Sequence, residues 1–97
     1  MSKVSVRTEE SNKPTFFIQE GETMMGEMNA SQSQGELVVT HTEVAPEAQG
    51  KGVAKQLFEA MINYARENNL KVTAQCSYVR TQLQRNAESY KDVWAQS

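Results

Sequence analysis

The sequence predicts a mixed α/β fold of the α+β type, with an antiparallel N-terminal meander, then a βαβ unit and a C-terminal helix. Short runs of β-branched and aromatic residues, punctuated by glycine or proline, fill the first half of the 97 residues. A helical repeat of apolar residues follows at 52–68. It lies between β-favouring runs at 36–44 and 71–79, and two strands joined through a helix are expected to be parallel.

The N-terminal half reads as a meander of three short strands. Val4 and Val6 alternate with polar residues and predict the first strand. Residues 15–19 form a β-favouring run, and Gly21 between two glutamates predicts a hairpin turn, because glycine tolerates a positive φ. Residues 23–29 then return as a third strand, and the polar stretch 30–35 is expected to be a loop.

The βαβ unit follows. Alternation along residues 36–44 predicts a strand that ends before Pro46, with one face formed by Leu37, Val39, His41 and Glu43. The helix predicted at 52–68 has its apolar residues at i, i+3, i+4 and i+7 spacing. The next strand, 71–79, is expected to carry Val72, Ala74, Cys76 and Tyr78 on one face, and a final helix is predicted within 80–94.

Composition limits the classes of function. The chain is 38% hydrophobic and 23% charged with a net charge of −2, which predicts one domain over residues 1–97 and argues against a nucleic-acid surface. No apolar run approaches the ~20 residues that span a bilayer, so no membrane partner is expected. Cys76 is the single cysteine, which excludes an internal disulfide and a multi-cysteine zinc site. We therefore expect no metal, and a reducing, cytoplasmic location.

Two glycines mark the junction between the strand and the helix, in the stretch 49–54. Backbone N–H groups at such a junction are unpaired and lie at the positive end of the helix dipole, where they can bind a phosphate. A P-loop needs Ser or Thr after its Lys, but Gly52 and Val53 follow Lys51 here. A dinucleotide fingerprint needs a third glycine where Lys55 stands. Spacing alone leaves open a glycine pair that only tightens the turn.

The junction resembles the acetyl-CoA signature Gln/Arg-x-x-Gly-x-Gly/Ala of the GCN5-related N-acetyltransferases, in the form Gln49-x-x-Gly52-x-Ala54. The likeness covers residues 36–94 well and extends to a small single-domain subgroup of about 90–100 residues. The marks of that subgroup found here are His41-Thr42-Glu43-Val44, Cys76-Ser77-Tyr78 and Ser89-Tyr90-x-Asp92-Val93.

This resemblance implies a truncated version of the family's mixed sheet that binds acetyl-CoA as the acetyl donor. Backbone amides of the glycine turn would hold the CoA pyrophosphate, and the edge of the preceding strand would pair with the pantetheine arm. The residues so implied are Glu43, Val44, Ala45, Gln49, Gly50, Lys51, Gly52, Val53 and Ala54. Longer members carry N-terminal helices and two more C-terminal strands, for which 97 residues leave no room. We therefore expect an open cleft, an unidentified acceptor that is a small amine or a protein, and a monomer or weak homodimer.

Cys76 and His41 are the candidate catalytic residues. Each alone is more often an ordinary strand residue, but both are predicted near the C-terminal ends of neighbouring parallel strands, where a base beside a thiol would activate it. Cys76 also precedes a predicted helix, whose positive end favours a thiolate. In the resembling subgroup these positions are the suspected catalytic pair.

Two mechanisms remain open. Either Cys76 becomes acetylated and passes the group on, with His41 as base, or an amine attacks acetyl-CoA directly, with Glu43 as a possible base. A CoA-binding module without turnover is the alternative function, and a structural protein that keeps only the glycine turn is a third.

Overall fold

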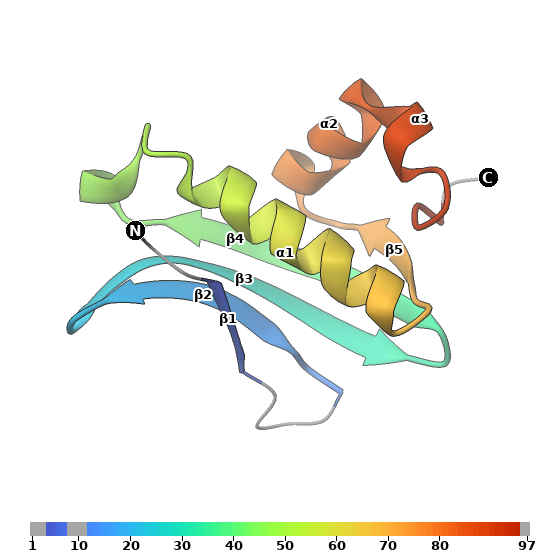
Figure 1. The fold of residues 1–97 in the computed structure, drawn as a ribbon, viewed down its shortest axis with the longest axis horizontal. Helices are drawn as coiled ribbons and strands as arrows, with labels where there is room; N and C mark the ends of the chain where they lie inside the picture. The colour runs from blue at the N-terminus through green and yellow to red at the C-terminus, as the bar shows by residue number, and fades with distance from the viewer. Residues whose placement is uncertain (1–3, 8–11, 96–97) are drawn as a thin grey trace.

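The computed structural model describes residues 4–7 and 12–95, and its strands form one five-stranded sheet in the order β1-β2-β3-β4-β5 (Figure 1). The elements in chain order are β1 (Val4–Arg7), β2 (Thr15–Glu20), β3 (Thr23–Ser33), β4 (Glu36–Val44), the 3-10 turn η1 (Pro46–Ala48), α1 (Val53–Glu67), β5 (Lys71–Ala74), α2 (Ser77–Arg85) and α3 (Ala87–Tyr90). None of the described helices is long and apolar enough to cross a membrane.

The predicted topology is confirmed. Strands β1 to β4 pair antiparallel with their sequence neighbours, and β5 returns parallel to β4 after the crossover through α1. The helix α1 packs its buried side across the sheet, and the apolar core lies between the two layers (Figure 1). The fold is therefore a mixed sheet with the predicted meander and βαβ unit.

The prediction of a loop at residues 30–35 is wrong for residues 30–33, which belong to a strand. Strand β3 runs on to Ser33 and pairs with the start of β4, so only Gln34 and Gly35 form the turn. Both have positive φ, 42° and 81°, as a two-residue hairpin turn requires. Ala30 is buried against the core, so long-range pairing outweighs the polar composition of the segment.

The strand predicted at 71–79 is also too long. Strand β5 ends at Ala74, and α2 begins at Ser77 because Val79 and Leu83, four residues apart, are both buried in the core. Cys76 is consequently the N-cap residue of α2 rather than a strand residue. The chain then returns to β5, where Val72 forms an isolated bridge with Trp94.

Candidate functional site

Two glycines shape the loop between η1 and α1. Gly50 and Gly52 have φ values of 84° and 77°, in the left-handed region that side chains disfavour. A Cβ added at either position would meet nothing within 4 Å. Glycine is therefore needed for its backbone conformation, and the space beside the loop is open.

The first turn of α1 is left without a cap. Gly52 is the N-cap residue and supplies no side-chain hydrogen bond, and the first turn holds no acidic residue. The first intrahelical bond is donated by Gln56 N to Gly52 O at 3.0 Å, so the N–H groups of Val53, Ala54 and Lys55 have no partner within the helix. Uncapped N–H groups at a helix start, beside an open loop, favour an anionic ligand such as a phosphate.

A pocket of about 250 Å³ lies at this loop. It is lined by Val44, Ala48, Gln49, Gly50, Gly52, Val53, Ala54, Lys55 and Tyr78. Six of the nine residues predicted to bind the donor are among them. Lys51 is exposed on the loop, while Glu43 and Ala45 line a separate pocket of about 300 Å³ with Met24 and Pro46.

Strand β4 outlasts its parallel partner at this end of the sheet. Its pairing with β5 stops at Val39 opposite Ala74, although β4 continues to Val44. Ala45 N donates to Met25 O at 2.9 Å, and antiparallel pairs alternate between bonded and non-bonded positions. The main-chain groups of Thr42 and Val44 therefore point away from β3, toward the side that β5 has left. An amide-containing chain could pair with this free edge.

A β-bulge in β4 changes the predicted faces. Asn29 pairs with His41 but Ala30 pairs with Val39, so Thr40 is an extra residue. After it, Thr42 continues on the helix-covered side, while His41 turns to the opposite face. The prediction that His41 shares a face with Leu37 and Val39 is wrong, because one inserted residue reverses the alternation.

Cys76 contacts Thr42 rather than His41. Its half-buried Sγ–H donates to Thr42 Oγ1 at 3.2 Å. The His41 side chain is 62% exposed on the other face of the sheet, where its Nε2 lies 3.7 Å from Glu43 Oε1. Adjacent strand residues point to opposite faces, so the contact between Cys76 and Thr42 puts His41 out of reach of the thiol. The structure does not bring the predicted pair together.

Tyr78 belongs to the pocket but was not predicted as a site residue. Burial of its phenol, with smaller contributions from Glu59, Cys76 and Tyr90, raises the pKa of Tyr78 above its usual value near 10. The hydroxyl is therefore a neutral proton donor over the physiological range. Its position could have indicated a site residue, because Tyr78 follows Cys76 by two residues and lies in the first turn of α2.

Metal ions are held in proteins by groupings of ligand side chains. Within residues 4–7 and 12–95, no three His, Cys, Asp or Glu side chains are grouped closely enough to hold an ion. The site that the described residues do form has a loop for an anion, a free strand edge, a thiol and a phenol.

Comparison with known proteins identifies the family of the chain. The profile described as GCN5-related N-acetyltransferase matches residues 15–93. A GCN5-like putative N-acetyltransferase from Staphylococcus aureus, solved by NMR, is 35% identical, with a TM-score of 0.72 over 100% of this chain and 93% of that one. No curated protein matches the sequence significantly.

Two longer structures share the fold at lower identity. The aminoglycoside N-acetyltransferase AAC(6')-Iy in complex with CoA is 19% identical with a TM-score of 0.57, and this chain covers 66% of it. An aminoglycoside acetyltransferase from an uncultured soil metagenomic sample, in complex with sisomicin, is 18% identical with a TM-score of 0.60 and is covered to 63%. On the profile and the Staphylococcus aureus structure, the chain belongs to the GCN5-related N-acetyltransferase family.

Proposed function

We propose that this chain transfers an acetyl group from acetyl-CoA to a primary amine. The observation that carries the proposal is the uncapped start of α1 at a positive-φ glycine loop, open to a pocket that also includes Val44 and Tyr78. Phosphate, pantetheine and thioester would follow one another along this line, and a protein with the same fold is in complex with CoA.

In this proposal the donor is held mainly by backbone groups. The pyrophosphate is bound by amides of residues 50–54, with the Gln49 and Lys51 side chains beside it. The amides of the pantetheine arm pair with the free edge of β4 around Val44, flanked by Glu43 and Ala45. Acetyl-CoA is the donor substrate, and the reaction needs no metal.

We further propose that the thiol and the histidine serve different substrates. Cys76 lies on the side of the sheet that carries the donor pocket. After the thiol has lost its proton to solvent, the thiolate can attack the acetyl carbonyl, form acetyl-Cys76 and release the CoA thiolate, which takes a proton. Tyr78, a neutral phenol that lines the same pocket, can supply that proton. An acceptor amine then attacks the acetyl-cysteine, the C–S bond breaks, and the proton lost by nitrogen passes to a base.

His41 is better placed to be that base than to activate Cys76. It lies on the helix-free face beside Glu43, whose carboxylate can stabilise a protonated imidazole at 3.7 Å. Direct attack of the amine on acetyl-CoA uses the same arrangement without the acetyl-Cys76 step. The two routes differ only in whether Cys76 carries the group.

Intact mass of the protein incubated with acetyl-CoA, measured together with CoA release, tests the proposal. We expect an adduct of one acetyl group in the native protein and none in Cys76→Ala. Full turnover with an amine in Cys76→Ala would favour direct transfer. If acetyl-CoA binds but neither an adduct nor amine-dependent CoA release appears, the chain is a CoA-binding module instead.

A further inference from the structure

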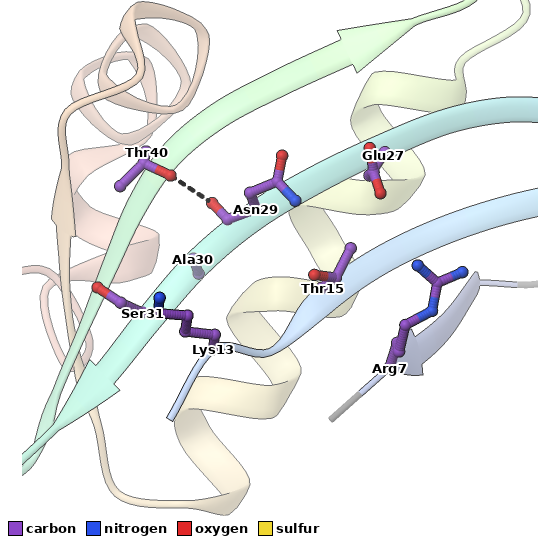
Figure 2. Close-up of a pocket in the computed structure, with 8 residues that line it drawn as sticks. All are labelled: Arg7, Lys13, Thr15, Glu27, Asn29, Ala30, Ser31 and Thr40. Atoms are coloured by element: carbon purple, nitrogen blue, oxygen red, sulfur yellow. Dashed lines mark hydrogen bonds between the residues drawn. The ribbon is translucent and has the colours of Figure 1, made fainter. Parts of the chain in front are cut away.

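A second pocket lies on the face of the sheet opposite the helices. It has a volume of about 510 Å³, within the range of small-molecule sites, and Figure 2 shows its residues in front of the strands, with α1 behind them. The donor pocket described above does not share a residue with it. Nothing in the proposed binding of acetyl-CoA accounts for this second pocket.

Strand register explains which residues meet there. Arg7 pairs with Thr15, Thr15 with Asn29, and Asn29 with His41, so these four side chains form one row across the outer face. The first three line the pocket, and His41 is the next residue along the row. The candidate base therefore lies at the edge of the second pocket, beside Asn29.

The bulge in β4 connects the pocket to the donor side. Thr40, the extra residue, lines the pocket and donates its hydroxyl to Asn29 O at 3.3 Å (Figure 2). It directly follows Val39, where β4 loses its pairing with β5. The second pocket thus approaches the point where the sheet opens, which is where an acetyl group held on the other side would be reached.

Three charged residues of the described chain line the pocket. Arg7 and Lys13 supply two cations and Glu27 one carboxylate, and within the described part of the chain no ion pair includes any of them. Arg7 lies over the Phe17 ring, 4.6 Å from its centroid, which leaves its N–H donors available. Glu27 is directly opposite Glu43, and like charges in such a pair destabilise a sheet unless a cation lies between them.

We infer that this pocket binds the acceptor, and that the acceptor is a zwitterion: an amino acid or short peptide with a primary amine and a carboxylate. Its amine lies toward Glu27 and Asn29, near His41, and its carboxylate pairs with Lys13 or Arg7. A polyamine would leave both cations uncompensated, and a simple anion would meet Glu27. The inference rests on the proposed acetyl transfer and names its acceptor.

Matched acceptors test the inference by removing one charge at a time. Alanine and alaninamide form one pair, and alanylalanine and its C-terminal amide form the other, which distinguishes a free amino acid from a peptide. We expect kcat/KM for the carboxylate-bearing member to exceed that of its amide roughly tenfold, the value of one charge-assisted hydrogen bond. Equal rates within both pairs, or a preference for putrescine, would overturn the inference while leaving acetyl transfer intact.

A lysine substitution tests the pocket itself. Lys13→Gln should raise KM for the preferred acid about tenfold with little change in kcat, and should leave the amide unaffected. Lys91→Gln is the matched control, because Lys91 is an exposed lysine of the C-terminal segment whose ion pair is with Glu88. Identical kinetics of the two variants would refute the role of Lys13.

Binding without turnover separates this inference from the proposed function. In the presence of CoA, alanylalanine should shift the backbone NMR signals of Thr15, Asn29 and Thr40, and Lys13→Gln should weaken this effect. Such shifts without acetylation would support the pocket and refute the transferase. Acetylation of amines without shifts at these residues would support the transferase and refute the pocket as the acceptor site.

Discussion

Gly26 in β3 lies under the first turn of α1, which makes Gly26→Ala a test of the donor site from a distance. A Cβ at this position would lie 2.6 Å from Val53 Cγ1 and 3.2 Å from Leu57 Cδ1. Carbon atoms in contact are about 3.5–4.0 Å apart, so Val53 would have to move by roughly 1 Å. Its β-branched side chain has one strongly preferred rotamer in a helix, so the helix start itself must shift.

We expect Gly26→Ala to lower the free energy of unfolding by about 1–3 kcal/mol, as overpacking does, measured by urea denaturation. Because the displaced turn carries the uncapped N–H groups, acetyl-CoA affinity should fall roughly tenfold, or 1.4 kcal/mol. Gly26 does not itself line the donor pocket, but its partner in the sheet, Val44, does, and the added Cβ would also lie 3.3 Å from Glu43 O.

A double-mutant cycle with Val53→Ala supplies the control. Val53→Ala alone should cost about 2 kcal/mol, since two buried methyl groups are lost. In the double variant the new methyl group at position 26 occupies part of the space left by Val53, so the two costs should fall short of additivity by about 1–2 kcal/mol. Additive costs would refute the contact. A destabilised Gly26→Ala with native acetyl-CoA affinity would refute the role of the α1 start in binding the donor.

Three further predictions have separate readouts. Gly52→Ala and Gly21→Ala both force alanine into a positive φ, and each should lower the free energy of unfolding by about 1–2 kcal/mol. Only Gly52→Ala should weaken acetyl-CoA binding. Equal affinities of the two variants would argue against the loop as the pyrophosphate site. The hydrogen bonds from Arg66 lower the pKa of Asp92 in the folded state below its usual 3.8. Their stabilisation of the fold is therefore present above pH 3.8 and is lost as the pH falls through the lowered pKa. The difference in urea midpoint between the native protein and Asp92→Asn should shrink below pH 4, and a constant difference would contradict this linkage. Burial raises the pKa of Tyr78 in the folded state above 10, so the fold should lose stability as the pH rises through that raised pKa. Tyr78→Phe should reduce this loss. Identical dependence of stability on alkaline pH in the two proteins would contradict the prediction.

The order and direction of the strands were predictable because their signals are local. Alternating apolar residues, Gly21 in its turn and Pro46 after β4 marked the ends of elements, and the helical repeat of α1 fixed the crossover. The segment at residues 30–33 carried no such signal. It is a strand because Ala30 packs into the core and its neighbours pair with β4, and pairing partners cannot be read from composition.

The end of β5 was obscured by two overlapping patterns. Val72 and Ala74 continue an alternation that Cys76 and Tyr78 also satisfy, whereas Val79 and Leu83 have helical spacing. In the structure the helix prevails over the strand after Ala74. The N–H groups of Gln75 and Cys76 both donate to Val39 O, so β5 cannot continue its pairing along β4. The glycine turn before α1 was easier to predict, since Gly50 and Gly52 stand at a strand–helix junction and both have a positive φ.

The position of His41 depended on a bulge that leaves no trace in the sequence. The run from Val38 to Thr42 is β-favouring throughout and contains no glycine or proline where the alternation slips. Yet the extra residue Thr40 decides which side chains lie on each face. It keeps Thr42 on the side of Cys76, and it turns His41 outward to the row that ends at Arg7. A regular strand would have put the thiol and the imidazole on one face and left the outer pocket without a base. With the bulge, each face of β4 carries one of the two candidate catalytic residues, and in the proposed mechanism donor and acceptor approach the open end of the sheet from opposite sides.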